Sequence, residues 1–430
     1  MSSYQSILLQ NATILVPKGP GDDHVIPLKN HSLLIEGNRI ARIAPHIDPS
    51  SKSTEVIDCS AKIISPGFVD THHHVWQTQL KGRHADHSLL EYMVPGNMAS
   101  HSYKPEDVFW GQLGGCLEAL EAGTTTIVDH AHISYTTDHN NAALSATLSS
   151  GIRSIYCYCP TGRVKTWKPF EMEEEFLPAW LFEQLTSMCK AGPFANGRVT
   201  MGFAFDSFYL PKDVVINIFN QVRGLGIKTI TSHYVPSLLH GSRLARLLSG
   251  NAKSISSLGI DCHSNNTGSI VAQMKVGLQA ERARRNDRIH EAGKILPEFR
   301  FLPKMHSSLG QLAAARAIKM SDQIVICAAE EDPIAAIILH SAASDIDAVI
   351  VDGQFRKRNR QLATTKLDLE LMPNMKHEKS DVQWCDVATE LLKSRQSILE
   401  AEKASGADDR KAGFENIVRI FGTDKDKLVY

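Results

Sequence analysis

The sequence has almost no net charge and no long apolar run. Its 46 lysine and arginine residues nearly balance 47 aspartate and glutamate residues. There is therefore no basic field of the kind that attracts nucleic acid or anionic lipid, and we expect neither as a partner. The longest apolar stretch, Ile334 to Leu339, is too short to cross a bilayer. We expect no membrane-spanning segment.

The sequence also lacks paired cysteines and a recognisable secretion signal. Its eight cysteines are scattered, and Cys157 and Cys159 do not form the Cys-x-x-Cys pair that ligates zinc or carries redox chemistry. Residues 1–6 lack the basic region followed by an apolar region that marks a secretory signal. Reduced thiols without a visible signal predict a cytoplasmic protein.

The composition is that of a soluble enzyme with a sizeable core, with 43% hydrophobic and 22% charged residues. Because a single α/β barrel reaches about 250 residues, 430 residues predict one large domain and a smaller one.

The first 64 residues alternate short β-prone runs with turn residues, which predicts a small antiparallel β unit. Near the other end of the chain, residues 347–356 predict a strand, a turn at Asp352-Gly353 and a second strand, which could complete the same sheet. The predicted strands of the first part are Ser6–Leu9, Ala12–Val16, Ser32–Ile35, Arg39–Ile43 and Glu55–Ile57.

Three consecutive histidines follow the apolar, β-prone run that ends at Val69. Alternate side chains of a strand share a face, so His72 and His74 could point together into one cavity, while His73 would face the other way. Two imidazoles on one face suit a metal ion. The alternative is that they are ordinary polar residues of a pocket.

Beyond this strand, helical and β-prone segments alternate. A helix is expected from Pro105 to just before Gly123, and another over residues 214–222. Strands are expected at 124–132, 152–158, 199–204 and 226–233. Such alternation predicts parallel βα units, and in a closed barrel of these units the chemistry lies at the carboxyl ends of the strands. His72, His74 and His233 all fall at such ends.

A further short strand is expected to end at Asp261. Three imidazoles and a carboxylate form a fitting set of ligands for zinc or iron(II), with zinc the better candidate and one position left for water. Metal coordination lowers the pKa of that water to about 7. We therefore predict His72, His74, His233 and Asp261 as ligands of one divalent metal, with His233 and Asp261 in catalytic positions and Asp261 able to take a proton from the water.

Several motifs in order along residues 5–360 resemble the amidohydrolase superfamily, and in particular its chlorohydrolase and cytosine-deaminase-like branch. The resemblance implies a metal-containing (β/α)8 TIM-type barrel with a small β-sandwich built from both chain ends. It also implies hydrolysis of a non-peptide C–N bond, as in deamination of a heterocycle or opening of a cyclic amide. The motifs are Pro66-Gly67-Phe68-Val69-Asp70-Thr71-His72-x-His74, Gly123-Thr-Thr-Thr, the histidine that closes strand five, and Gly259-Ile-Asp261-x-x-Ser264-Asn265-Asn266.

The sequence also departs from the family pattern. Only 28 positions separate His233 from Asp261, whereas two further strands and three helices would need roughly fifty more residues. His240 is the only nearby candidate for the strand-six histidine, but seven residues cannot cross over and return parallel to strand five. Pro236 stands where many deaminases of this branch carry a glutamate. Together with a second gap after residue 315, these losses suggest a shortened gene product.

Other polar residues have a functional and a structural interpretation. Trp76 and Gln77 could meet substrate or pack the barrel mouth. His132 could line the substrate pocket, whereas we do not expect His130 and His132 to bind metal, because a better set is available. Ser264 and Asn265 are expected to fix the loop that carries Asp261. The remaining histidines, such as His139 and His263, are expected to be solvated or structural.

After residue 380 the sequence predicts an amphipathic helix over residues 380–403, with Ser380 or Asp381 as N-cap, and a second helix near residues 412–420. These helices are expected to pack on the barrel, and pairing between subunits, giving a homo-oligomer, is the alternative. The predicted domains are 1–64 with 340–372 (β-sandwich), 65–339 (barrel) and 373–430 (C-terminal helices).

Two classes of function follow from these observations. The first is a metal-dependent hydrolase of a small cyclic amide, amidine or aminated heterocycle. The second is a catalytically impaired relative that serves as a binding or subunit module.

Overall fold

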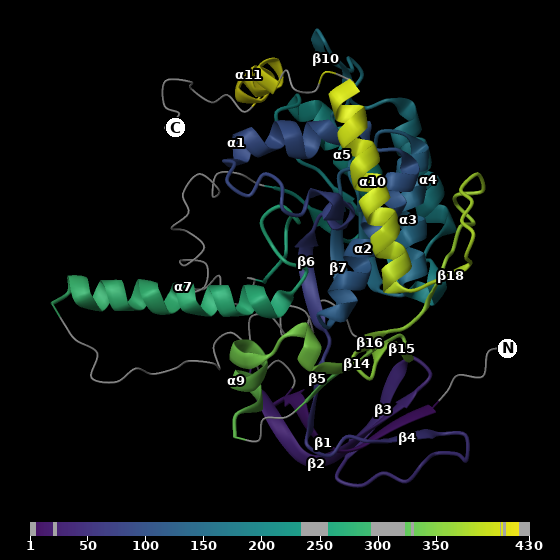
Figure 1. The fold of residues 1–430 in the computed structure, drawn as a ribbon, viewed down its shortest axis with the longest axis vertical. Helices are drawn as coiled ribbons and strands as arrows, with labels where there is room; N and C mark the ends of the chain where they lie inside the picture. The colour runs from purple at the N-terminus through teal and green to yellow at the C-terminus, as the bar shows by residue number, and fades with distance from the viewer. Residues whose placement is uncertain are drawn as a thin grey trace.

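The computed structural model describes residues 6–19, 24–233, 257–293, 323–327, 331–404, 406 and 410–420. Within these residues the chain forms two main sheets. Figure 1 shows the parallel sheet with its helices above, and a second sheet, which contains both early and late strands, below. His240 and Pro236 lie outside the described residues.

Five parallel strands form the sheet that carries the histidines, in the order β12-β11-β8-β7-β6. The alternation of helix and strand predicted from the sequence is confirmed for these units. The fifth strand is shorter than the predicted run over 226–233. The strands are β6 (Phe68–His73), β7 (Thr124–Ala131), β8 (Arg153–Tyr158), β11 (Val199–Ala204) and β12 (Ile230–Thr231), and the intervening helices are α2 (Pro105–Glu121), α3 (Thr137–Ser150), α4 (Ala179–Ala191) and α5 (Lys212–Gly224).

The segment from residue 257 to 261 extends this sheet on the free side of β6. The Thr71 N–H donates to the Leu258 carbonyl at 3.1 Å, and the Asp261 N–H donates to the His72 carbonyl at 2.9 Å. The His74 N–H donates in turn to the Asp261 carbonyl at 2.8 Å. A parallel bridge pairs His73 with Asp261. The backbone of Asp261 is thus tied to both ends of the His-x-His motif.

Helix α2 covers this sheet and ends where the sequence predicts. Its apolar residues, including Val108, Leu113 and Leu120, are buried. Gly123 then adopts a φ of 82°, a left-handed conformation that glycine takes without steric cost, and β7 begins at the next residue. The end of the helix therefore directs the chain straight back into the sheet.

The second sheet joins strands from both chain ends, as predicted. Its order is β16-β15-β14-β13-β5-β1-β2-β3, with β4 paired to β1. The two first predicted strands are one continuous strand, because Asn11, with a φ of 63°, forms a bulge instead of a turn. The strands are β1 (Ser6–Pro17), β2 (Val25–Glu36), β3 (Arg39–Ala44), β4 (Glu55–Asp58), β5 (Lys62–Pro66), β13 (Gln323–Cys327), β14 (Ile346–Val351), β15 (Gln354–Arg358) and β16 (Gln361–Leu362).

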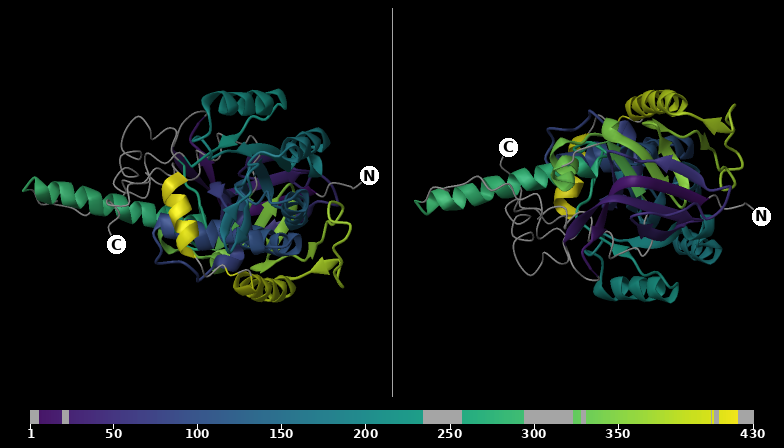
Figure 2. Two further views of the ribbon diagram at one scale, coloured as in Figure 1. Left: turned by 90° about the horizontal axis from the view of Figure 1, so that it is seen from above. Right: turned by 90° about the horizontal axis from the view of Figure 1, so that it is seen from below.

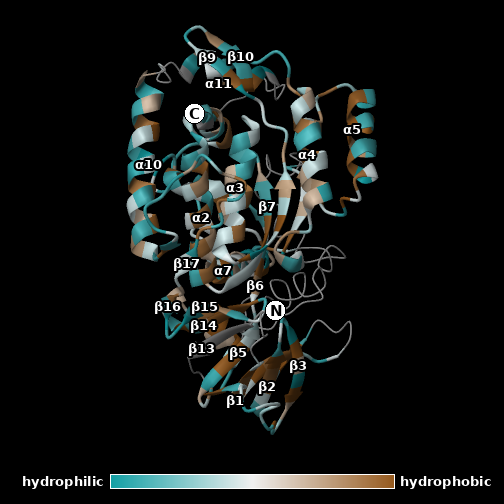
Figure 3. Cartoon of the chain, turned by 90° about the vertical axis from the view of Figure 1, so that its right-hand side faces the viewer, coloured by the Kyte–Doolittle hydropathy of each residue, from teal (hydrophilic) through white to brown (hydrophobic). Residues whose placement is uncertain are grey.

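Hydrophobic side chains connect the two sheets. Leu15 and Ile63 of the second sheet belong to the same buried cluster as Phe68 and Leu120. Figure 3 shows hydrophobic residues along β1, β2 and β5. Ile7 and Leu9 pack in one cluster and Leu8 in another, as expected for a strand whose two faces are both covered.

Shorter elements complete the described chain. Helix α7 projects beyond the rest of the described residues, as Figure 2 shows. No helix of the described residues is long and apolar enough to cross a membrane. The remaining elements are η1 (Val75–Leu80), α1 (Leu89–Tyr92), η2 (Met93–Asn97), η3 (Met98–Ser102), β9 (Val164–Trp167), β10 (Phe170–Met172), η4 (Ala195–Gly197), α7 (Ile270–Glu291), α9 (Pro333–Ala335), η7 (Ala336–His340), η8 (Ala343–Asp345), β17 (Thr365–Lys366) and β18 (Asp381–Val382).

The C-terminal helices are α10 (Trp384–Ala404) and α11 (Arg410–Ile420). Helix α10 packs on α2, where the Ser394 hydroxyl donates to Asp107 Oδ1 at 2.7 Å, so the expected packing on the barrel is confirmed. The predicted N-cap at Ser380 or Asp381 is wrong. Asp381 belongs to β18, which pairs with β17, and this strand pairing delays the start of the helix to Trp384.

Candidate metal centre

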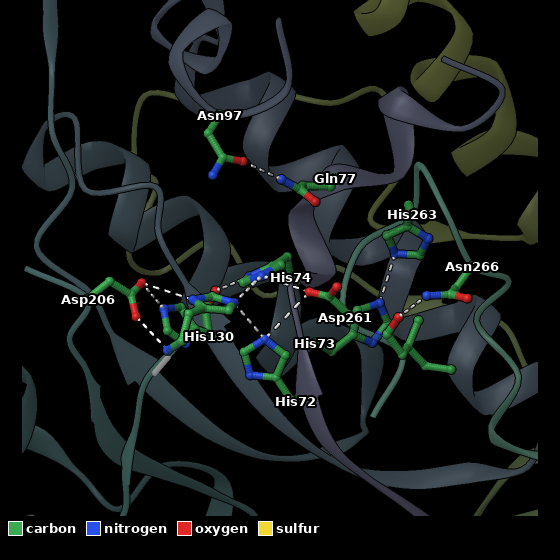
Figure 4. A network of polar contacts seen from close by, with 12 residues as sticks. His72, His73, His74, Gln77, Asn97, His130, Asp206, Asp261, His263 and Asn266 are labelled. Carbon is green, nitrogen blue, oxygen red and sulfur yellow. Dashed lines mark hydrogen bonds and ion pairs between the residues drawn. The ribbon is translucent and has the colours of Figure 1, made fainter. Parts of the chain in front are cut away.

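His72, His74, His233 and Asp261 meet at the carboxyl ends of the strands. His72 Nε2 lies 2.9 Å from His233 Nε2, and His74 Nε2 lies 3.1 Å from the same atom. Asp261 Oδ1 lies 3.3 Å from His74 Nε2 and 3.6 Å from His72 Nε2. One ligand atom from each of the four lies within 4.8 Å of the others. Figure 4 shows His72 and His74 directed toward this point.

The hydrogen bonds of two of these histidines leave their Nε2 lone pairs facing each other. His74 Nδ1 donates to the His130 carbonyl at 2.9 Å, and His233 Nδ1 donates to Asp206 Oδ2 at 3.1 Å. When both rings are neutral, each carries its proton on Nδ1 and the two Nε2 lone pairs face each other. Burial disfavours the charged form of His233, but its bond to Asp206 outweighs burial and raises its pKa, so a proton or a metal ion between the Nε2 atoms would remove the repulsion.

The spacing of the ligand atoms also suits a small metal ion. Ligand bonds of about 2.0–2.1 Å in a tetrahedron separate the ligand atoms by about 3.3 Å. Four of the six separations, from 2.9 Å for His72–His233 to 3.6 Å for His72–Asp261, bracket this value, and all six lie within 4.8 Å. The donor set of three imidazoles and one carboxylate could therefore hold one divalent ion.

Asp206 is the residue of this site that sequence analysis missed. It follows β11, and its Oδ1 accepts the His233 N–H at 2.8 Å while Oδ2 accepts His130 Nε2–H at 2.9 Å and His233 Nδ1–H. One carboxylate thus sets the position and the tautomer of His233, as the outer carboxylates of metal sites do. Its place directly after a β-prone run, at a strand end, was the available signal.

Charge and burial set the protonation of the site. Burial alone would raise the pKa of Asp206, but its hydrogen bonds to His130 and His233 outweigh burial and hold that pKa far below its usual value. Burial likewise opposes the charge on Asp261, while the imidazoles of His72 and His74 beside it lower its pKa strongly. Burial lowers the pKa of His74 to about 3, so this imidazole is neutral and free to ligate.

Asp261 holds an unusual backbone conformation. Its φ is 65°, in the left-handed region, where aspartate and asparagine are found more often than other residues except glycine. Asp70 fixes the segment in place, because its Oδ1 accepts the N–H groups of both His72 and Ile260, at 3.2 and 3.1 Å. The Asn266 amide donates to the Ile260 carbonyl at 2.8 Å and holds the following turn. Strain maintained by surrounding contacts is typical of functional sites.

His73 points to the opposite side of β6, as predicted. It is fully buried, with Nδ1 2.9 Å from Asp70 Oδ2 and Nε2 3.0 Å from His263 Nε2. Figure 4 shows His73 and His263 together, away from His72. His263 is thus structural and not solvated. The same alternation that aims His72 and His74 at the site places His73 in the packing behind it.

Trp76 and Gln77 are fully buried. The Trp76 ring packs against Tyr103 and His132, with centroids 5.1 and 5.5 Å apart, which supports packing of the barrel mouth over contact with substrate. Gln77 accepts the Tyr92 hydroxyl at 3.1 Å. Neither lines the cavity beside the site, among the residues that the structure describes, whereas His132 does.

His132 and His130 have different roles. The His132 ring lies with its centroid 4.0 Å from that of His74, tilted by 35°, and burial holds the pKa of His132 well below the usual value. His130 lies with Cys159 and Asp206 in a second group of potential ligand atoms. Its bond to Asp206 accounts for this arrangement, since a neutral His130 donates Nε2–H to that carboxylate.

Part of the chain is similar to proteins of one known family. Residues 63–204 match the model of the amidohydrolase family. The chain is 33% identical over 230 residues to the 5-methylthioadenosine/S-adenosylhomocysteine deaminase of Carboxydothermus hydrogenoformans, covering 53% of this chain and 48% of the relative. It is 35% identical over 102 residues to the 5'-deoxyadenosine deaminase of Methanocaldococcus jannaschii, covering 24% of each. The chain thus spans half or less of the length of these curated relatives.

Solved structures show the same fold over most of the chain. An adenosine deaminase from Xanthomonas campestris with bound zinc matches with a TM-score of 0.66 and 15% identity, covering 92% of this chain and 99% of that one. A mutant of the atrazine chlorohydrolase from Arthrobacter aurescens, in complex with zinc and atraton, matches with a TM-score of 0.66 and 13% identity, covering 91% and 100%. The predicted TIM-type barrel fold is confirmed, and residues 63–204 carry the match to the amidohydrolase family.

Proposed function

We propose that this chain binds one divalent metal ion, zinc in preference to iron, through His72, His74, His233 and Asp261, and hydrolyses a C–N bond of a small aminated heterocycle. The observation that carries the proposal is the pair of Nε2 lone pairs of His74 and His233, 3.1 Å apart beside the Asp261 carboxylate. Deaminases of adenosine-type substrates among the relatives support the choice of heterocycle.

A divalent metal in this position would polarise a coordinated water and lower its pKa to about 7. The chain's own residues supply the rest. Asp206 holds His233 with Nδ1 protonated, so its Nε2 faces the site. Asp261 is the carboxylate on the open side of the site, with its side chain 52% exposed, and its lowered pKa keeps it charged at neutral pH. It is therefore the group that accepts a proton from the attacking water and passes it to the leaving nitrogen.

His132 has a separate part in this proposal. It lines the cavity next to His233, and its low pKa keeps it neutral, so it can donate one hydrogen bond or accept one from a heterocycle. The substrate is a small molecule. A cytoplasmic location is a further part of the proposal, and pairing between subunits is the alternative role of the C-terminal helices.

Metal content tests the proposal. Full-length protein should carry close to one equivalent of zinc, and replacing His72 and His74 together by alanine should remove it, because two of four ligands are lost. His46→Ala is the matched control, since His46 is exposed, follows β3 of the second sheet and, among the described residues, pairs with Asp48. Ammonia release from aminated purines and pyrimidines measures the reaction. Metal below about a tenth of an equivalent in the unchanged protein would refute the proposal.

A second function is favoured by one feature of the sequence. Pro236 stands where many deaminases of the resembling branch carry a glutamate, and only 28 positions separate His233 from Asp261. A chain that retains the metal site but lacks this acid could bind heterocycles without turning them over. Full metal occupancy with tight binding and no ammonia release would identify this binding module.

A further inference from the structure

The C-terminal helix α11 lines a cavity that adjoins the candidate metal centre. The cavity has a volume of about 540 Å³, within the range of small-molecule sites. His132 and His233 line it, and so do Asn416, Ile417 and Arg419 of α11. Residues near the C-terminal end of the chain and residues of the candidate metal centre therefore face one space.

Core packing holds α11 in this position. Ile417 is buried in a cluster with Val94 and Met98, which follow α1, and with Val164 and Trp167 of β9. Figures 1 and 3 show α11 and β10 at the end of the molecule toward which β6 and β7 point. We call α1 with η2 and η3, the β9–β10 hairpin and α11 the cap. Three segments far apart in the sequence thus share one small core above the strand ends.

The cap gives the cavity an apolar, adaptable wall. Met93, Met98 and Met172 line it together with Ile417. Methionine side chains are flexible and polarisable, and they fit apolar groups of varied shape. Tyr209, which follows β11, lines the cavity with 57% of its surface exposed, and such a ring can cover a flat or apolar group. These side chains suit an apolar substituent, while the charged residues Arg163, Glu173, Glu175 and Arg419 also line the cavity.

Asn416 adds one polar contact to this wall. Its Oδ1 accepts Arg419 Nη2–H at 2.6 Å, but its Nδ2 is buried and has no hydrogen-bond partner among the described residues. A buried donor without an acceptor is costly, and a ligand that brings an acceptor to the cavity wall would satisfy it. Asn416 therefore has the geometry of a residue that distinguishes substrates.

We propose that α11 determines substrate specificity by contacting the part of the substrate that lies away from the reacting carbon. Ile417 packs on an apolar substituent, and Asn416 Nδ2 donates to an acceptor atom beside it. The substrate class is an aminated heterocycle that carries a polar linker and an apolar end, in preference to a bare ring. The inference rests on the proposed function, because it takes the histidine cluster as the reacting end.

Three probes with the same aminated ring test this assignment: adenine, 5'-deoxyadenosine and 5'-methylthioadenosine. Dissociation constants are measured by calorimetry on the zinc-loaded full chain, and kcat and KM by ammonia release. Ile417→Trp should weaken binding of 5'-methylthioadenosine about tenfold or more and leave adenine unchanged, because the larger ring occupies the apolar end. Asn416→Leu should weaken both nucleosides about tenfold and leave adenine unchanged, because it removes the donor at nearly constant volume.

Lys411→Ala is the matched control, because Lys411 is exposed on the same helix and does not line the cavity. It should bind all three probes as the unchanged protein does, and thermal unfolding checks that each variant folds. If both cavity variants change the dissociation constants of adenine and of the nucleosides equally, the role of α11 is overturned, but the proposed hydrolysis is not. Selective binding changes without ammonia release would overturn the reaction and support the role of α11. Binding of none of the probes would overturn the assignment of the cavity.

Discussion

Replacing Asp206 with asparagine is expected to weaken metal binding at the candidate centre, although Asp206 is not one of the proposed ligands. Its Oδ1 accepts the His233 backbone N–H at 2.8 Å. Because this N–H needs an acceptor, the amide oxygen of the asparagine must occupy the position of Oδ1. The amide NH2 then replaces Oδ2, which in the unchanged protein accepts both His233 Nδ1–H and His130 Nε2–H. The amide NH2 donor of the asparagine therefore faces two other donors, His233 Nδ1–H and His130 Nε2–H.

His233 can relieve this conflict only by moving its proton from Nδ1 to Nε2. Nε2 is the atom that lies 2.9 Å from His72 Nε2 and 3.1 Å from His74 Nε2. A proton there removes the lone pair from the ligand set. Loss of such an outer partner costs about 10- to 100-fold in metal affinity, or about 1.4 to 2.7 kcal/mol.

Competition with a chromophoric zinc chelator measures this change. Asp107→Asn is the matched control, because Asp107 is also buried and accepts two hydrogen bonds, from Lys104 N–H and the Ser394 hydroxyl, but lies under α10. The control should lose folding stability and keep its metal affinity. An Asp206→Asn variant that folds and binds zinc within twofold of the unchanged protein would refute the tautomer argument.

Two further changes test the structure around the site. Burial raises the pKa of Asp129 from 3.8 to about 6, so the folded protein binds the Asp129 proton more tightly than the unfolded chain does. The contribution of Asp129 to the free energy of unfolding is therefore fully present below pH 3.8 and falls by roughly 3 kcal/mol as the pH rises past 6. Asp129→Asn should remove this loss, so denaturant unfolding at pH 4 and pH 7.5 should show a smaller change in stability for the variant than for the unchanged protein. An equal change in both proteins would refute the reasoning. Gly259→Ala would place a Cβ 2.7 Å from the His72 carbonyl oxygen and push residues 257–261 off β6, lowering stability by about 1–3 kcal/mol and weakening zinc binding. Gly224→Ala, where nothing lies within 4 Å, is its control, and equal zinc affinity in both glycine variants would show that the close approach is unimportant.

Local patterns in the sequence predicted the elements whose causes are local. The apolar spacing from Val108 to Leu120 and the glycine at 123 predicted α2, and β-branched residues predicted β7. The strand-turn-strand at Asp352-Gly353 joined the sheet of the first residues as expected. The period of two also predicted the opposite directions of His72 and His73, because alternation on a strand is a property of the backbone.

Contacts between distant segments decided what local patterns left open. Pairing of β17 with β18 delayed the start of α10 to Trp384, and packing against Tyr103 and His132 buried Trp76. The hydrogen bond between Asp206 and His233 forms because the ends of β11 and β12 lie side by side, and no spacing in the sequence reveals this pairing.

The sequence by itself predicted the resemblance to the amidohydrolase superfamily, the strand that carries His72 and His74, and His233 and Asp261 as their partners, because residue type and period encode these directly. Only the tertiary structure decided that Asp261 is tied to the backbone of both His72 and His74, that Asp206 sets the tautomer of His233, and that α11 lines the adjoining cavity. Those relations arise from packing among segments far apart in the chain, and their free energy depends on distances that a linear pattern does not contain.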